Sequence, residues 1–312
     1  MRICWVSDHI GEIGHGAGMS DEHVARALAA RGHEVIVAAG LDEAVPKGFD
    51  VVRTRPGPGR TSRSVRECSP DVVIVPAGCK FVVGELRYEL PCVFMVRSSA
   101  AGAPKIQGYA GICAGIVTCA SWTAAAMRAL GARVVVLHDA TPAVDETPPI
   151  GANVVLPSAF GPKGVATFAA VARALPDLPF VAIGLPWTSP ADRAGLERVA
   201  NVRILSALPP IDLLALTRVL LLPSEHEAFC GATRFAAMHG RAVVASRIPG
   251  IVESTGEGAI YVDLGADPRV WAEAVRRAWD AGGPSGKVPL CDLGAEMDAF
   301  VALLEDVRLR EA

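Results

Sequence analysis

Several features that would point to particular protein classes are missing from this chain of 312 residues. Aromatic residues make up only 5% of it, and no apolar run reaches the roughly 18–20 residues that a membrane span requires. Acidic residues occur too early in the first fourteen positions for a secretory signal. We therefore expect a cytoplasmic protein with no stable membrane insertion.

The spacing of cysteine and histidine is not that of a metal site. The eight cysteines form no C-x-x-C pair and no H-x-x-x-H accompanies them, so we predict no metal. Most of the cysteines stand in apolar surroundings, where a reduced cysteine behaves as a small core residue. There is also no G-x-S-x-G and no G-x-x-x-x-G-K-[ST], which disfavours a serine hydrolase and a P-loop kinase.

Charge is low and unevenly distributed. The net charge is −3; residues 1–140 carry 15 basic and 13 acidic side chains (+2), and residues 141–312 carry 15 and 20 (−5). Neither balance is typical of a general nucleic-acid binder.

What the chain does have is a regular alternation of short apolar strands with amphipathic helical stretches. Ile3–Ser7 reads as a strand and Ser20–Arg31 as a helix with Ser20 as its N-cap. The alternation pauses in the proline-rich stretch 140–150, which we interpret as a linker. We therefore predict α/β architecture with two doubly wound, Rossmann-like parallel-sheet domains, residues 1–145 and 146–288, facing a cleft, and a final helix in 289–312 that packs back across the domain junction.

A glycine cluster follows the first expected strand. Gly11, Gly14, Gly16 and Gly18 precede the first expected helix, where glycines let the backbone approach a phosphate and the helix N-terminus favours an anion. A glycine-rich turn without a ligand is an equally good interpretation. The spacing is not a clean G-x-G-x-x-G, which disfavours a dehydrogenase.

The second half of the chain contains two further candidate loops. In 160–164, FGPKG, Lys163 stands at a helix entrance, where it can neutralise a diphosphate or simply be a solvated loop lysine. In 220–254 a buried strand ends at Pro223, and an acidic turn with Glu225 and Glu227 follows. The small-residue loop 230–233 then opens a helix, which makes an anion site beside a carboxylate. The same acids can also serve only as capping charges.

This last stretch resembles the donor-binding segment of family-4 retaining glycosyltransferases. The matching positions are Pro223, Ser224, Glu227, Phe229, Gly240, Val243, Val244, Ala245, Ser246, Gly250 and Glu253. The stretches GHGAG and PKGV are similar to the family's N-terminal loop and its Glu-Lys-Gly-Val turn. The resemblance implies the GT-B fold, with a nucleoside-diphosphate sugar, UDP-sugar first among them, bound as co-substrate in the C-terminal domain.

The resemblance also implies roles for particular residues. Glu227 would contact the donor sugar and Lys163 the diphosphate, both as catalytic residues without a metal. The expected donor-binding residues are Gly16, Gly18, Ser158, Leu208, Phe229, Cys230, Gly231, Thr233 and Phe235. His15 and Arg97 are expected on the acceptor side.

The chain departs from the family pattern at four places. Phe235 stands where the family has a second glutamate for the ribose, and Phe cannot accept its hydrogen bonds. Arg97 occupies the usual place of a histidine, Ser158 or Ala159 that of an arginine, and Ala228 that of a glycine. Donor recognition must therefore differ from the family's.

An arginine-rich stretch in the first half is the one clue to the acceptor. Residues 53–66 carry arginines at 53, 55, 60, 63 and 66, and their glycines and prolines predict a loop. It is either a solvated surface loop or a site for an anionic acceptor, with Arg60 and Arg63 as ligands. Phosphorylated small molecules and a hydroxylated base in modified DNA are the acceptors ranked first; sugars, lipids and natural products stay open.

These patterns predict glycosyl transfer, and two alternatives stay open. The Phe235 departure favours a non-catalytic sugar-nucleotide binding protein or a degenerate partner subunit. A sugar-nucleotide epimerase on the same fold is the other alternative. The oligomeric state is not indicated by the sequence.

Overall fold

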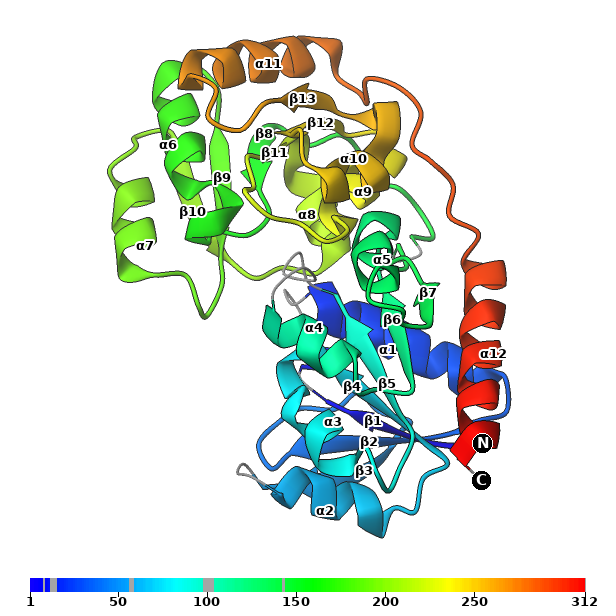
Figure 1. Ribbon diagram of the computed structural model, residues 1–312. Coiled ribbons are helices and arrows are strands. Elements are labelled where there is room, and N and C mark those ends of the chain that lie inside the picture. Colours follow the sequence, from blue (N-terminus) through cyan, green and yellow to red (C-terminus); the bar gives the residue numbers. More distant parts are fainter. Residues whose placement is uncertain (8, 12–15, 56–58, 98–103, 142–143, 312) are drawn as a thin grey trace. The chain divides into compact units, whose positions relative to one another are not determined.

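The computed structural model describes residues 1–7, 9–11, 16–55, 59–97, 104–141 and 144–311 (Figure 1). The chain divides into two compact units. The first is Met1–Ala140 with Cys291–Ala312, and the second is Thr141–Leu290. Each unit is built around one parallel sheet.

The sheet of the first unit has seven strands in the order β3-β2-β1-β4-β5-β6-β7, all parallel. The strands are β1 (Arg2–Val6), β2 (Glu34–Gly40), β3 (Asp50–Thr54), β4 (Val72–Pro76), β5 (Cys92–Val96), β6 (Gly115–Thr118) and β7 (Val134–Val136). Every residue of β4 and β5 is buried, because helices cover both faces of a parallel sheet of this kind.

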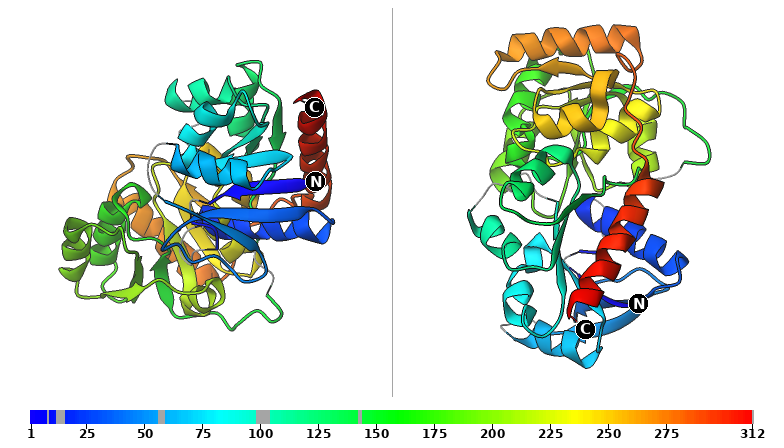
Figure 2. Two further views of the ribbon diagram at one scale, coloured as in Figure 1. Left: turned by 90° about the horizontal axis from the view of Figure 1, so that it is seen from below. Right: turned by 45° about the vertical axis from the view of Figure 1, so that its right-hand side comes forward.

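The helices of the first unit include the end of the chain. They are α1 (Gly16–Ala30), α2 (Arg60–Glu67), η1 (Ala77–Cys79), α3 (Phe81–Leu86), α4 (Pro104–Ala110), α5 (Ser121–Arg128) and α12 (Leu293–Glu311). Helix α12 runs beside this sheet (Figure 2). Its Phe300 and Leu304 share a core with Trp5 of β1, and a β-carbon at Gly115 would approach Leu303 Cδ1 to 2.9 Å.

The sheet of the second unit has six parallel strands in the order β10-β9-β8-β11-β12-β13. The strands are β8 (Asn153–Leu156), β9 (Phe180–Gly184), β10 (Val202–Ser206), β11 (Thr217–Leu222), β12 (Ala242–Ser246) and β13 (Ile260–Val262). The helices are η3 (Gly161–Lys163), α6 (Val165–Ala174), α7 (Pro190–Glu197), α8 (Pro210–Leu216), α9 (Gly231–Met238), α10 (Pro249–Thr255), η4 (Gly256–Gly258) and α11 (Pro268–Ala281).

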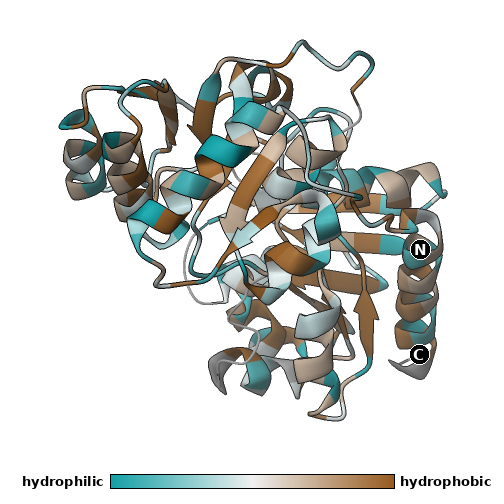
Figure 3. Ribbon diagram, turned by 90° about the horizontal axis from the view of Figure 1, so that it is seen from above, coloured by the Kyte–Doolittle hydropathy of each residue, from teal (hydrophilic) through white to brown (hydrophobic). Residues whose placement is uncertain are grey.

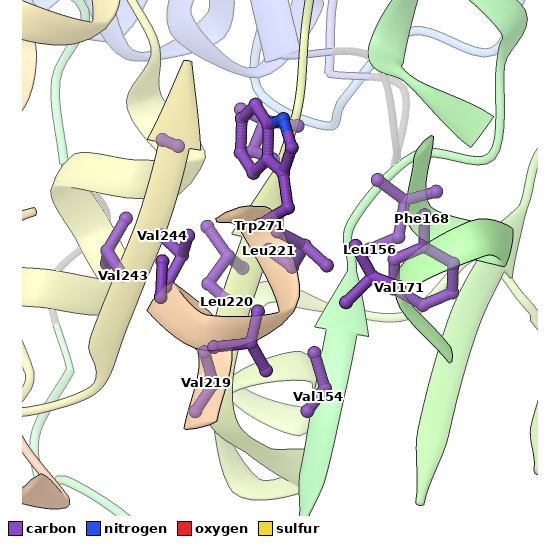
Figure 4. Close-up of a cluster of buried hydrophobic side chains, with 14 of the residues drawn as sticks. Val154, Leu156, Phe168, Val171, Val219, Leu220, Leu221, Val243, Val244 and Trp271 are labelled. Atoms are coloured by element: carbon purple, nitrogen blue, oxygen red, sulfur yellow. The ribbon is translucent and has the colours of Figure 1, made fainter. Parts of the chain in front are cut away.

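Apolar side chains fill the space between the second sheet and its helices. Phe168 of α6 and Trp271 of α11 belong to one buried cluster with Leu156 of β8 and Leu221 of β11 (Figure 4). In Figure 3 the strands are mostly hydrophobic, whereas the helices show hydrophobic and hydrophilic positions side by side. This is the pattern of helices that bury one face on a sheet. No helix in the described part of the chain is long and apolar enough to cross a membrane.

The proline-rich segment 140–150 contains no helix or strand in its described residues. The buried guanidinium of Arg241 donates to the carbonyls of Pro148 and Pro149 over 2.6 and 2.9 Å, and also to those of Leu214 and His239. Burial lowers the pKa of Arg241. This arginine therefore fastens the start of the second unit to its core.

Two elements differ from the sequence prediction. Helix α1 begins at Gly16 rather than after Ser20, so Ser20 lies inside the helix and is buried. The arginine-rich stretch is not a loop throughout, because Arg60–Glu67 forms α2. Burial of Thr61, Ser62 and Val65 against the first unit outweighs the local turn signals of glycine and proline.

Candidate active site

The second sheet reverses its strand order between β8 and β11, which lie side by side at its centre. Open parallel sheets bind ligands outside the carboxyl ends of their strands at such a switch point. Two loops start there. Residues 157–164 follow β8 and contain Lys163, and residues 223–230 follow β11 and contain Glu227.

The two loops are in direct backbone contact. Gly164 has φ +83° and lies so close to Pro223 that a β-carbon there would be 2.1 Å from the Pro223 carbonyl oxygen. The backbone N–H of Glu225 donates to the carbonyl of Pro162 over 2.9 Å, and the Ser224 hydroxyl donates to the same carbonyl over 3.4 Å. Only glycine fits at 164, both for its positive φ and for the space.

This contact brings the two predicted catalytic side chains together. Lys163 Nζ donates to Glu227 Oε1 over 2.6 Å. The side chain of Lys163 is 29% exposed and that of Glu227 is 9% exposed. An ammonium has three donors, so Lys163 can hold Glu227 and still reach a bound anion.

The start of α9 lies at the end of the same loop. Cys230 is its N-cap residue, and in the described residues no side chain caps this helix end. The Thr233 hydroxyl donates to the Cys230 carbonyl over 3.0 Å. The N–H groups in the first turn of any helix have no intrahelical acceptor. Such an end carries partial positive charge and favours phosphate oxygens.

The thiol of Cys230 is not set up as a nucleophile. Burial, followed by the negative charge of Glu227, raises its pKa to about 12. The thiol is therefore protonated at neutral pH, and a thiolate is the reactive form. Cys230 contributes to the site through its backbone position.

Gly250 supports the Glu227 loop from the other side. A β-carbon at Gly250 would lie 2.3 Å from the Glu227 carbonyl oxygen and 2.5 Å from that of Ala228. The Cys230 N–H points to the Gly250 carbonyl over 3.4 Å. Gly250 is one of the positions that carry the family resemblance, but the sequence does not indicate its close approach to the Glu227 loop. It also does not indicate that the Pro162 carbonyl accepts hydrogen bonds from Ser224 and Glu225.

Phe235 is buried within α9. Its ring centroid lies 4.5 Å from that of His239, and its own side chain is 5% exposed. The neighbouring Arg234 is equally buried and donates to the carbonyls of Ser254 and Pro289 over 3.2 and 2.6 Å. The position expected to face the ribose therefore carries no polar atom.

The remaining residues predicted for the donor site are placed as follows. Ser158 is half-buried in the β8–η3 loop, and Phe229 is buried between Glu227 and α9. Leu208 lies in the loop after the edge strand β10, two strands from β8, and packs on the cluster around Val155 and Ile183. Gly16 and Gly18 belong to the first turn of α1 in the other unit, where the Gly18 carbonyl accepts from the Gly11 N–H over 2.8 Å.

Arg97, predicted for the acceptor side, is enclosed by its own unit. Its Nε pairs with Asp21 over 2.8 Å, and its Nη1 pairs with Asp139 and donates to Ser20 Oγ over 2.8 Å. The side chain is 7% exposed. Burial acts to lower the pKa of Arg97. The negative charges of Asp139 and Asp21 outweigh burial, so the pKa is raised above its usual value. His15, also predicted here, lies outside the described residues.

The arginines of the 53–66 stretch do not act as one group. Arg53 donates to the carbonyls of Gly40 and Glu43 over 2.8 and 2.6 Å, and Arg66 pairs with Glu89 over 2.5 Å. Arg60 and Arg63 are exposed on α2. Arg53 and Arg66 thus have partners within the protein, whereas Arg60 and Arg63 face solvent.

Part of the chain is similar in sequence to a known protein family. Residues 154–281 match the sequence model of the family Glycosyl transferases group 1. These residues contain Lys163, Glu227 and α9. A search of curated proteins gives no match.

Solved structures match nearly the whole chain. A sucrose-phosphate synthase from Thermosynechococcus elongatus has a TM-score of 0.76 at 16% identity, covering 99% of this chain and 97% of that one. The catalytic domain of starch synthase IV from Arabidopsis thaliana, bound to ADP and acarbose, has 0.71 at 13%, covering 99% of each. Anabaena HepE in complex with UDP-glucose has 0.69 at 14%, covering 100% of this chain and 98% of that one.

The predicted fold class is confirmed by the two parallel sheets and by these neighbours. The family match over the second unit supports the predicted glycosyltransferase activity. The chain has the GT-B fold, and its sequence and structure support a glycosyltransferase.

Proposed function

We propose that the chain transfers a sugar from a nucleoside-diphosphate donor, bound by the second unit, to an acceptor hydroxyl with retention at the anomeric carbon. The observation that carries this proposal is the Lys163–Glu227 pair at the β8/β11 switch point, beside the uncapped start of α9. Retention rests on the resemblance to the family-4 enzymes.

The chemistry is electrostatic. When the bond between the anomeric carbon and the diphosphate oxygen breaks, negative charge grows on the departing diphosphate. Lys163 and the first N–H groups of α9 stabilise that charge, which is the contribution that lowers the barrier most in such sites. Glu227 holds Lys163 in place and accepts hydrogen bonds from the sugar hydroxyls.

We propose that this lysine and the helix end take the part that a divalent cation plays elsewhere, so that the reaction is independent of a metal. A UDP-sugar is the first donor to test, because UDP-glucose is bound by the structural neighbour HepE. The neighbouring starch synthase is bound to ADP, so ADP-sugars belong in the same panel.

The acceptor we propose carries phosphate, because Arg60 and Arg63 are exposed on α2 and arginine suits phosphate oxygens. A phosphorylated small molecule is the first candidate. A hydroxylated base in DNA is the second, since the same two arginines can contact a nucleic-acid backbone.

One observation favours a second function. Phe235 offers no acceptor for ribose hydroxyls, which would suit a protein that binds a nucleotide sugar without turning it over. An epimerase would alter the donor without an acceptor. The experiment below separates all three.

The test is a mass-spectrometric screen of pooled nucleotide sugars against pooled acceptors, modified DNA included, with and without a chelator. We expect one donor to release its nucleoside diphosphate and transfer its sugar to one acceptor. The rate should be the same with and without the chelator. In Lys163→Ala and Glu227→Ala, turnover should fall about 100- to 1,000-fold, while Arg173→Ala, an exposed cation at the other end of α6, keeps it.

Absence of turnover with every donor would leave only a binding protein, and donor conversion without an acceptor would indicate the epimerase. Full activity of the double variant Arg60→Ala/Arg63→Ala would remove α2 from the acceptor site.

A further inference from the structure

Three side chains with metal-ligating atoms meet where the chain leaves the first unit and where it returns. His138 follows β7, Cys291 is the first residue to return, and Glu296 lies in the first turn of α12. One ligand atom from each residue lies within 4.8 Å of the others, and all three residues are half-buried. All three belong to the first unit.

The carboxylate of Glu296 is held in a fixed orientation. The backbone N–H of His138 donates to Glu296 Oε2 over 2.9 Å, and Glu296 Oε1 lies 2.7 Å from His138 Nδ1. The Glu296 N–H in turn donates to the Asp292 carbonyl over 2.9 Å. The side chains of His138 and Glu296 are only 13% and 19% exposed. Two of the three ligand groups are therefore already held side by side.

The ligand set is specific in its chemistry. An imidazole nitrogen, a thiolate and a carboxylate oxygen are the ligands that Zn²⁺ takes in proteins. A thiolate and an imidazole disfavour Mg²⁺ and Ca²⁺, which prefer oxygen. We propose that His138, Cys291 and Glu296 form a binding site for a zinc-class transition metal ion, with the fourth position open to water.

Only small movements are needed to form the site. Ligand bonds of about 2.0–2.3 Å in a tetrahedron put the donor atoms roughly 3.3–3.8 Å apart. The outermost of the three atoms would move in by about 1 Å, and the His138–Glu296 contact would open by a similar or smaller amount. The thiol and the ring nitrogen that face the metal give up their protons, so binding releases protons and strengthens as the pH rises.

The bound ion would tie the outgoing segment of the chain to the returning one. On the side of the second unit the same two segments are already joined, because Arg234 donates to Thr141 Oγ1 over 3.3 Å and to the Pro289 carbonyl over 2.6 Å. In the first unit the His138–Glu296 contact already joins them. The site is separate from Lys163 and Glu227, which belong to the other unit.

The experiment is metal titration of the full chain after treatment with a chelator. Zn²⁺ is titrated in competition with a chromophoric chelator, and Co²⁺ is followed by its absorption. We expect one tightly bound ion, a thiolate-to-Co²⁺ charge-transfer band, and a higher midpoint of thermal unfolding with Zn²⁺. No donor or acceptor is needed, so the result does not depend on glycosyl transfer.

The variants assign the ligands. Cys291→Ser should abolish the charge-transfer band and weaken Zn²⁺ binding roughly tenfold or more, because the softest of three ligands is lost. Glu296→Gln should keep the band and weaken binding, which separates ligation from an altered fold. Cys113→Ser is the matched control, since Cys113 is another half-buried thiol of the same unit and should leave both readouts unchanged.

The proposal is overturned if the wild type binds no Zn²⁺ beyond the competitor, or if Cys291→Ser and Cys113→Ser bind it equally well.

Discussion

The two units each enclose a cationic side chain beside carboxylates, and they use it differently. In the first unit Arg97 is 7% exposed and is shared by Asp21, Asp139 and Ser20. In the second unit Lys163 pairs with Glu227 and is 29% exposed. An enclosed arginine paired with two acids serves the fold, whereas a partly exposed lysine with a single acid beside it can also reach a ligand. The comparison supports our proposal that the second unit carries the chemistry.

The largest expected effect concerns Arg97. Replacing it by Met removes the cation that pairs with Asp21 and Asp139, whose side chains are only 8% and 16% exposed. Removing one partner of a buried ion pair costs about 3–5 kcal/mol, so Arg97→Met should lower the free energy of unfolding by about that much in a urea titration.

The triple variant Arg97→Met/Asp21→Asn/Asp139→Asn is the control, because it removes the stranded charges as well and should recover part of the loss. A cost below about 1 kcal/mol for Arg97→Met, the size typical of an exposed pair, would show that Arg97 does not stabilise the fold as described.

A smaller effect is expected at Phe235. Phe235→Glu restores a carboxylate at the position where the resemblance places the ribose contact. A hydrogen bond to a charged group contributes about 1.5–3 kcal/mol, part of which is lost to burial of the new carboxylate. We expect the Kd for the nucleoside diphosphate to fall about tenfold, measured by calorimetry.

Phe235→Leu keeps an apolar side chain of similar burial and should bind as the wild type does. If Phe235→Glu folds, as judged by circular dichroism, and binds no more tightly than Phe235→Leu, then Phe235 does not face the ribose.

Features determined by neighbouring residues could be predicted from the sequence, whereas features that depend on residues far apart in the chain could not. The strand expected at Ile3–Ser7 is β1 (Arg2–Val6), predicted to within one residue because a continuous apolar run is a local signal. The start of α1 was predicted four residues late, since Gly16 and Gly18 are poor helix formers and the fold overrides that preference. The residues of α2 were taken for a loop because glycines and prolines stand directly before them in the sequence.

The candidate site was predictable only where a motif carried it. Lys163 and Glu227 were chosen from separate motifs 64 residues apart, and the structure brings them to 2.6 Å. The enclosure of Arg97 could not be predicted, because Asp139 is 42 residues away and no local pattern announces it. The His138–Cys291–Glu296 group was missed for the same reason, since His138 and Glu296 are 158 residues apart and the prediction of no metal rested on local spacing.

The account rests most directly on Lys163 as a ligand for diphosphate. The measurement that tests it is calorimetric titration of the wild type, Lys163→Ala and Arg173→Ala with UDP and ADP. Loss of one charge-assisted contact costs about 1.5–3 kcal/mol, so the account predicts that Lys163→Ala binds its nucleotide at least about tenfold more weakly while Arg173→Ala is unchanged. Equal affinity of all three proteins would contradict it.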